Sequence, residues 1–339
     1  MNRDVVALPK AHLHLHLEGA MRPSTLRELA AAQGMPVPPV TQGTYSTFGA
    51  FAGLYVAATA VIRSEAMLRR VVREVVEDAA ADGVVWLEPA LYSPRYRDVI
   101  GSDRAAIEVV LDELRTAGDE FGVGCGLIVA ADRTVDVGEA VILAKIASRM
   151  TGQGVVGFGL ANDEAGWPAE PFAEAFMIAL DAGLLSVPHG GELEGPASVA
   201  ACIDACQADR VMHGVRAVED PKLLERLADM EVCLDVCPSS NVALSVVPSF
   251  EEHPLPALID AGVRCSVNAD DPLLFGPGIA HEYQACRERL GFDDVRLAQI
   301  ACWSLEASAA PHDLVAAAVK EIEVWLNDPV VPGAPQPVR

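Results

Sequence analysis

Eight short apolar runs alternate with longer amphipathic stretches along this chain of 339 residues. The short runs have the length and composition of buried parallel strands, and the stretches between them repeat apolar residues at helical spacing. The pattern predicts strands at residues 11–18, 84–91, 123–130, 155–161, 184–192, 209–214, 232–237 and 263–269. It predicts helices at residues 65–82, 103–121, 137–150, 171–182, 197–207, 221–230 and 254–261.

This alternation predicts an α/β protein, and specifically a (β/α)8 barrel of the TIM type. A doubly wound open sheet is the alternative, but that fold usually places a glycine-rich phosphate turn after the first strand, and no G-x-G-x-x-G stands there. Residues 35–53 interrupt the first passage from strand to helix, and we expect a short lid-like insertion there. We expect one barrel domain over residues 1–327 and a loose, proline-containing tail over 328–339.

The chain is strongly acidic, with 25 basic and 48 acidic side chains and a formal net charge of −23. Such a charge repels phosphate polymers and anionic lipid, so we expect neither nucleic acid nor a membrane as a partner. Assembly into a homo-oligomer is left open. The first residues contain no apolar segment of signal-peptide length, and the eight cysteines include no Cys-x-x-Cys pair. We therefore expect reduced thiols and a cytoplasmic location.

Histidine and acidic residues gather where four of the predicted strands end. The first strand contains His12, His14 and His16, and alternation along a strand turns all three toward one face. The fifth, sixth and eighth strands end in further such residues, namely His189, Glu192, His213, Asp270 and Asp271. Because barrel active sites form at the carboxyl ends of the strands, we expect these side chains to share one site.

Three imidazoles and one carboxylate, from His14, His16, His189 and Asp270, form a donor set typical of a catalytic zinc ion. We expect one divalent metal ion, in the first place Zn²⁺, although iron and manganese accept the same ligands. Such an ion makes water a nucleophile at neutral pH, which favours hydrolysis over redox chemistry. The four lysines lie outside the predicted strands, so a modified lysine bridging two metals has no candidate.

The other strand-end groups suit proton transfer. A carboxylic acid such as Glu192 can hand a proton to a ring nitrogen, His213 can orient an attacking water, and Asp271 can accept a hydrogen bond. A metal-dependent amidase or ester hydrolase on the same barrel is one alternative, and it needs no such acid. A binding protein that has lost its chemistry is another, but that predicts a broken ligand or acid position, and every position is intact.

Five motifs stand in a specific order and spacing: LHLHLEG at 13–19, HGGE at 189–192, HG at 213–214, CPSSN at 237–241 and NADDP at 268–272. Together they resemble the adenosine deaminase family of the amidohydrolase superfamily, from about residue 8 to about residue 311. The resemblance implies a zinc-dependent hydrolase that converts a 6-aminopurine into a 6-oxopurine and ammonia. It also implies zinc ligation by His14, His16, His189 and Asp270.

The resemblance implies roles for the remaining strand-end residues. Glu192 is expected to protonate purine N1, which makes C6 electrophilic. His213 is expected to orient the water that attacks C6, and Asp271 to accept a hydrogen bond beside that water and the purine edge. His16 is expected to face the substrate as well as the metal.

Four positions bear on the identity of the aminopurine. Glu18 stands where relatives acting on adenosine usually carry Asp near the ribose, and thereby resembles the branch acting on free adenine. Asn162 lies in the segment GLANDE (159–164), which resembles the corresponding motif of the nucleoside branch. Asn162 stands there in place of a glycine whose backbone N–H approaches purine N3. Phe48 and Phe51 resemble the family's apolar lid. Adenosine or a related nucleoside, with or without a 5′ modification, is the leading expectation, with adenine and aminodeoxyfutalosine as alternatives.

Overall fold

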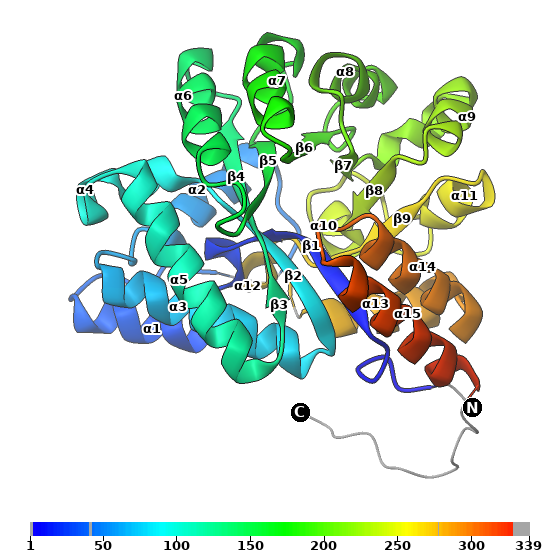
Figure 1. Cartoon of the computed structure of the whole chain (residues 1–339), viewed down its shortest axis with the longest axis horizontal. Coiled ribbons are helices and arrows are strands. Elements are labelled where there is room, and N and C mark those ends of the chain that lie inside the picture. Colours follow the sequence, from blue (N-terminus) through cyan, green and yellow to red (C-terminus); the bar gives the residue numbers. More distant parts are fainter. Residues whose placement is uncertain (1–2, 41–42, 277, 328–339) are drawn as a thin grey trace.

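Parallel strands follow one another in sequence order around a single sheet in the computed structural model of the protein (Figure 1). The structure describes residues 3–40, 43–276 and 278–327. The strand order is β1-β2-β4-β5-β6-β7-β8-β9, with β3 as a short neighbour of β2. Within the described residues, the strands are β1 (Lys10–His16), β2 (Val84–Leu91), β3 (Gly124–Cys125), β4 (Leu127–Asp132), β5 (Val155–Ala161), β6 (Leu185–Gly190), β7 (Arg210–His213), β8 (Cys233–Val236) and β9 (Cys265–Val267).

Hydrogen bonds between β1 and the segment after β9 close the sheet into a barrel. The His16 N–H donates to the Asp270 carbonyl over 3.0 Å, and the Asp270 N–H donates to the His14 carbonyl over 3.1 Å. The side-chain oxygen of Asn268 accepts the Leu13 N–H over 2.7 Å. The predicted (β/α)8 barrel is therefore confirmed, and the doubly wound alternative is wrong because the first and last strands meet.

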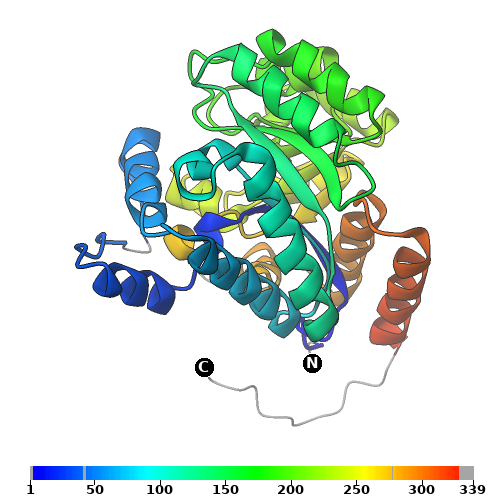
Figure 2. The ribbon, with the colours of Figure 1, turned by 60° about the vertical axis from the view of Figure 1, so that its left-hand side comes forward.

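Helices form the outer layer of the barrel, and the two views in Figures 1 and 2 place them around the strands. Each helix predicted from the sequence overlaps an observed one. The described helices are α1 (Pro23–Ala32), α2 (Phe48–Thr59), α3 (Glu65–Ala81), α4 (Arg97–Ile100), α5 (Asp103–Phe121), α6 (Val137–Ser148), α7 (Ala173–Asp181), α8 (Pro196–Cys206), α9 (Pro221–Asp229), α10 (Pro238–Ala243), α11 (Leu255–Asp260), α12 (Pro272–Phe275), α13 (Ile279–Leu290), α14 (Asp294–Glu306) and α15 (His312–Asn327).

Local sequence explains where the helices begin and which face they bury. The Ser64 hydroxyl accepts the Met67 N–H at the start of α3, and the Ser102 hydroxyl accepts the Ala105 N–H at the start of α5. Both are N-cap bonds that satisfy a free amide of the first turn. In α3 the buried residues recur at helical spacing and face the strands, namely Leu68, Val71, Val72, Val75, Val76 and Ala79.

The predicted strands at residues 84–91 and 155–161 match the structure, and the other six differ at their ends by one or two residues. The third predicted strand is split at Gly126, where a Cβ would lie 2.7 Å from the Val156 side chain, so the chain bends at a close approach that only glycine permits. The first strand begins at Lys10, one residue early. The Lys10 side-chain amino group donates to the Asp82 carbonyl over 2.7 Å. This contact lies at the amino end of β1, away from the histidines at the other end of the strand.

The expected insertion is partly helical. Residues 35–40 and 43–47 are irregular, and α2 then begins after Thr47, whose hydroxyl accepts the Ala50 N–H over 3.1 Å. The described residues of the insertion pack against the barrel core through Tyr45 and Phe51. Movement of this segment as a lid stays a prediction. The division into a barrel over residues 1–327 and a tail also stays a prediction, since residues 328–339 lie outside the described residues.

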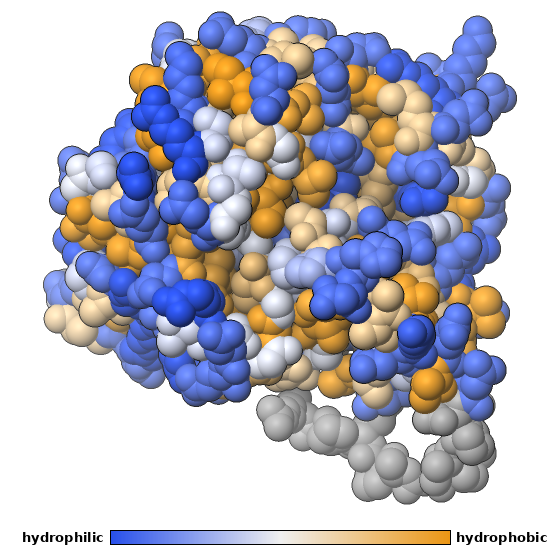
Figure 3. All heavy atoms as spheres, in the orientation of Figure 1, coloured by the Kyte–Doolittle hydropathy of each residue, from blue (hydrophilic) through white to orange (hydrophobic). Residues whose placement is uncertain are grey.

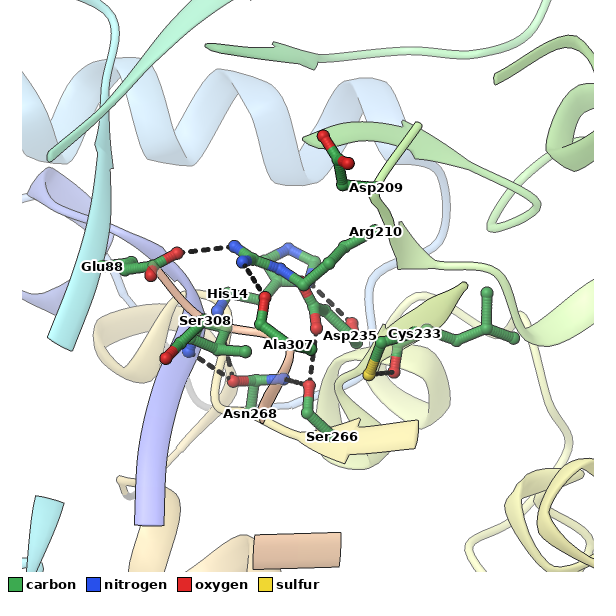
Figure 4. A network of polar contacts seen from close by, with 12 residues as sticks. His14, Glu88, Asp209, Arg210, Cys233, Asp235, Ser266, Asn268, Ala307 and Ser308 are labelled. Atoms are coloured by element: carbon green, nitrogen blue, oxygen red, sulfur yellow. Dashed lines mark hydrogen bonds and ion pairs between the residues drawn. The ribbon is translucent and has the colours of Figure 1, made fainter. Parts of the chain in front are cut away.

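A polar network fills part of the barrel interior below the site (Figure 4). Arg210 on β7 donates to Glu88 on β2 over 2.6 Å and to Asp235 on β8 over 2.9 Å. Asp235 also accepts the Ser266 hydroxyl over 2.7 Å, and that hydroxyl accepts the Asn268 amide over 2.7 Å. All five residues are fully buried, so each charge depends on its partners rather than on water.

The outer surface mixes charged and apolar side chains on the face drawn in Figure 3. Scattered exposed apolar residues of this kind are normal for globular proteins. Among the described helices, none is both long enough and apolar enough to cross a membrane.

The buried arginine yields a stability prediction. Arg210→Met leaves Glu88 and Asp235 as buried carboxylates without their cation, so the free energy of unfolding should fall by about 3–5 kcal/mol, measured by urea denaturation. Arg226→Met is the matched control, because its ion pair with Asp204 is exposed and should cost less than about 1 kcal/mol. An Arg210→Met protein as stable as the control would contradict the structural role of the network.

Candidate active site

The polar residues predicted at the strand ends converge at one end of the barrel. His14 and His16 come from β1, His189 from β6, and Asp270 from the turn after β9. The Asp270 carboxylate lies 3.5 Å from His14 Nε2 and 3.3 Å from His16 Nε2. His16 Nε2 and His189 Nε2 lie 3.3 Å apart. Three pairs among the four expected ligands are thus 3.3–3.5 Å apart. Within 4.8 Å, possible ligand atoms group His14 with His189 and His213, and Asp270 with His14 or with His16.

Hydrogen bonds on the far side of two rings fix their tautomers. His14 Nδ1 lies 2.9 Å from the Asp235 carbonyl, and His189 Nδ1 lies 2.8 Å from the Leu160 carbonyl. A carbonyl can only accept, so each Nδ1 carries the hydrogen and each Nε2 presents a lone pair to the centre. His14 Nε2 is buried and has no hydrogen-bond partner. Lone pairs this close repel one another unless a cation lies between them.

The spacing of these atoms suits a small divalent cation. Ligands about 2.05 Å from a tetrahedral zinc are about 3.3 Å apart, which is close to the separation of the pairs His14–Asp270, His16–Asp270 and His16–His189. The donor set of imidazoles and one carboxylate also suits zinc, iron or manganese. The residues present therefore fit a metal of this kind.

Burial keeps most of the imidazoles neutral. It lowers the pKa of His16 to about 4 and holds the pKa of His189 well below its usual range. Burial also opposes charge on His14 and Asp270, but their proximity outweighs it, so the pKa of His14 rises and the pKa of Asp270 falls well below its ordinary value. Neutral His16 and His189 and an ionised Asp270 are in the forms that bind metals. The raised pKa of His14 favours its charged form beside Asp270, and metal binding would release that proton.

His213 has the opposite tautomer. His253 accepts the Leu255 N–H at Nδ1, so its Nε2 carries the hydrogen and donates to the Asn241 side-chain oxygen over 3.1 Å. The Asn241 amide nitrogen then faces His213 Nδ1 at 3.2 Å and donates to it. His213 Nε2 is consequently an N–H donor aimed into the site, 3.4 Å from Glu192. This tautomer suits a hydrogen-bond donor and not a metal ligand.

Glu192 and Asp271 differ from Asp270 in the direction of their pKa shifts. Burial, reinforced by the negative Asp270, raises the pKa of Glu192 and of Asp271 well above their usual range. Each therefore favours the neutral acid, which can donate a proton. One oxygen of each is buried without a hydrogen-bond partner. A Cβ at Gly19 would lie 1.5 Å from the Asp271 carboxylate, which explains the glycine of the first motif.

Several site residues adopt left-handed backbone. Asp270 has φ 60°, His213 φ 64° and Asn162 φ 81°, a region that non-glycine residues rarely occupy and that clusters at functional sites. Asp270 is held there by its pairing with β1, and the preceding Ala269 donates its N–H to His12 Nε2 over 3.2 Å. His12 faces this turn and is not among the converging donors.

A cavity of about 160 Å³ opens beside the strand-end residues. Its wall includes the predicted Glu18, Phe48, Phe51 and Asn162, together with His16 and Asp271. All predicted site residues are thus brought together. A larger, more open hollow of about 670 Å³ lies beside α5 and includes none of these residues.

Glu18 is held by two tyrosines that were not predicted as site residues. Its two carboxylate oxygens accept the Tyr55 hydroxyl over 3.2 Å and the Tyr96 hydroxyl over 3.0 Å. The Arg95 guanidinium lies 5.3 Å from the Tyr55 ring centre. Tyr55 is on α2, so the insertion supplies part of the site. Tertiary contact alone reveals these partners, because they lie 37 and 78 residues from Glu18.

The apolar part of the cavity wall comes mainly from α2. Phe51 stacks on Phe275 with ring centres 4.9 Å apart, and Phe48 lies 5.5 Å from Phe51. On the other side, the Asn162 amide donates to Asp132 over 2.8 Å, so its side chain turns into the β4–β5 loops. The predicted aromatic wall is present, with Phe51 anchored in the core.

Known proteins match the chain over nearly its whole length. The family model described as Adenosine deaminase matches residues 9–325. A Streptomyces coelicolor protein provisionally described as an adenosine/adenine deaminase is 45% identical, covering 96% of this chain and 98% of that protein. An adenine deaminase from Agrobacterium fabrum is 35% identical, covering 89% and 94%.

Solved structures share the fold. The crystal structure of adenine deaminase from Arthrobacter aurescens superposes with a TM-score of 0.87 at 29% identity, covering 95% of this chain and all of that one. An amidohydrolase from Burkhoderia ambifaria, with bound Zn, gives a TM-score of 0.83 at 26% identity, covering 95% and 93%. With the family model and the strand-end site in agreement, the chain belongs to the adenosine deaminase family and is a deaminase acting on aminopurines.

Proposed function

We propose that this protein is a zinc-dependent deaminase whose preferred substrate is free adenine, converted to the 6-oxopurine and ammonia. The observation that carries the choice of substrate is the state of Glu18. Both of its oxygens accept tyrosine hydroxyls, and it lines a cavity of about 160 Å³. Pockets for larger ligands usually measure about 300 Å³ or more.

The metal would be held by His14, His16, His189 and Asp270. The fixed tautomers of His14 and His189 and the separations of 3.3–3.5 Å support this ligand set. A bound Zn²⁺ supplies a water that is nucleophilic at neutral pH.

The chain's own groups provide the rest of the chemistry. Glu192, neutral because it is buried, would donate its proton to ring nitrogen N1 and so draw electrons from C6. His213, with its N–H aimed into the site, would orient the attacking water and steady the charge that develops on its oxygen. Asp271 would accept a hydrogen bond at the purine edge. The water oxygen bonds to C6 as the C6–amino bond breaks. One water proton leaves with the amino group as ammonia, and the other restores the acid form of Glu192.

Free adenine also fits the polar wall. The base carries a ring N–H at N9 or N7 that a nucleoside lacks, and Glu18 places a carboxylate acceptor in the cavity lining. Each Glu18 oxygen accepts one tyrosine hydroxyl and keeps a further lone pair, so the carboxylate can also accept this ring N–H. This acceptor supports the adenine branch, which Glu18 resembles.

Adenosine or a 5′-modified adenosine is the second candidate substrate, and the backbone of Asn162 supports it. Asn162 keeps a left-handed φ of 81°, so its backbone can follow the course of the glycine in the nucleoside branch. Relatives named aminodeoxyfutalosine deaminase, such as one from Streptomyces avermitilis at 33% identity, fit this candidate.

The cellular setting follows from the cysteines. All eight are free thiols, and six are buried, which supports the reducing cytoplasm as the location.

A substrate panel tests the proposed function. Purified protein would be given adenine, adenosine, 2′-deoxyadenosine and aminodeoxyfutalosine, with deamination followed by its ultraviolet change. We expect kcat/KM for adenine to exceed the others by at least about tenfold. We also expect about one zinc per chain by elemental analysis, with activity lost on chelation and restored by Zn²⁺. Turnover of none of the four would contradict deamination, and a preference for adenosine would contradict the choice of base.

Glu192→Gln tests the proton donor. The variant keeps the side-chain volume but has no proton to give, so kcat should fall by about 10²–10⁴-fold while zinc content is retained. The exposed Glu194, two residues along the same loop, provides the matched control, and Glu194→Gln should keep wild-type kcat. Comparable kcat values in the two variants would exclude Glu192 as the acid.

A further inference from the structure

The Glu164 side chain, on the loop after β5, binds an unusual number of donors. One oxygen accepts the backbone N–H of Gly191 over 2.8 Å. The other accepts the N–H groups of Glu192, Leu193 and Glu194 over 2.9, 2.6 and 3.0 Å. Four consecutive amides thus surround one buried carboxylate, which is the arrangement of a backbone anion nest.

Two further groups hold the carboxylate in place. The Ser198 hydroxyl at the start of α8 donates to it over 2.7 Å. The fully buried Arg133 lies 3.9 Å from the same oxygen and also donates to the His189 carbonyl and, over 3.3 Å, to the Trp167 carbonyl. The end of β6 is therefore held by two side chains, one from the segment after β4 and one from the loop after β5.

The position of Glu192 depends on this arrangement. Its own side-chain oxygen Oε1 is buried without a hydrogen-bond partner, so no side-chain bond holds that oxygen in place. The left-handed Gly191, with φ 68°, lets the loop turn so that its amides face Glu164 while the Glu192 side chain faces the site. The carboxylate of Glu164 is thus what fixes the Glu192 backbone.

We propose that Glu164 is a positioning residue for catalysis: it occupies the nest formed by residues 191–194 and holds the proton-donating Glu192 at the distance that the reaction needs. This inference rests on the proposed role of Glu192 as the acid. Glu164 does not line the cavity, so it has no contact with a substrate there. It acts through the backbone of the loop, and after burial and Asp270 its negative charge also helps to raise the pKa of Glu192. A displacement of about 1 Å at a reacting group can cost about 10²-fold in rate.

Glu164→Gln tests the inference with full-length, zinc-loaded protein. The amide has one acceptor oxygen, and its NH₂ group opposes an N–H donor, so the loop should loosen. Hydrogen exchange of the 191–194 amides should speed up by at least about tenfold. With adenine as substrate, kcat should fall by about 10–100-fold while KM and zinc content stay within about threefold.

Glu170→Gln is the matched control, since Glu170 is exposed on a nearby turn, and it should change neither exchange nor kcat. If Glu164→Gln does not fold, Glu164→Asp retains the charge but falls about 1.5 Å short, and the same two measurements apply with the same expected direction.

Either variant would overturn the inference if the loop amides stayed protected, or if kcat were unchanged despite faster exchange. Parallel losses of zinc and kcat would also overturn it, because they would mark a collapsed site. A wild-type protein that deaminates no aminopurine would refute the proposed function instead, and the exchange measurement would still report whether Glu164 holds the loop.

Discussion

Closing a parallel sheet into a barrel brings the carboxyl ends of all its strands to one mouth, and the rest of this structure depends on that constraint. The expected ligands on β1, β6 and the turn after β9 are separated by up to 256 residues, yet Asp270 lies 3.3–3.5 Å from His14 and His16, and His16 lies 3.3 Å from His189. Ionisable groups confined to so small and dry a space would repel or neutralise one another without support. Hydrogen bonds from residues around the site stabilise these groups.

The support takes a different form for each group. Backbone carbonyls accept the Nδ1 hydrogens of His14 and His189 and so expose their Nε2 lone pairs. A chain of hydrogen bonds through Asn241 gives His213 the other tautomer. One barrel mouth can thus present both metal ligands and an N–H donor from the same residue type.

Environment also separates the carboxyl groups. Asp270, surrounded by imidazoles, has a lowered pKa, whereas burial and the charge of Asp270 raise the pKa of Glu192 and Asp271. Two titratable groups whose surroundings push their pKa values apart are the usual basis for assigning an acid and a base. The helix α2 adds the apolar wall and Tyr55, so the insertion after the first strand shapes the substrate side of the same cavity.

The sequence by itself determined the architecture and the donor set. Strand and helix periodicity follow from local side-chain patterns, and a barrel places strand-end residues together by topology, so His14, His16, His189 and Asp270 were recognisable. Local pattern also placed the insertion, but not the helix within it that begins at Phe48.

Only the tertiary structure decided how those residues are held. The Nδ1 bonds of His14, His189 and His213, the tyrosines on Glu18 and the amide nest around Glu164 join residues 27–221 positions apart. No short-range pattern records such contacts, because a hydrogen bond across the barrel depends on distances that exist only once the strands have closed.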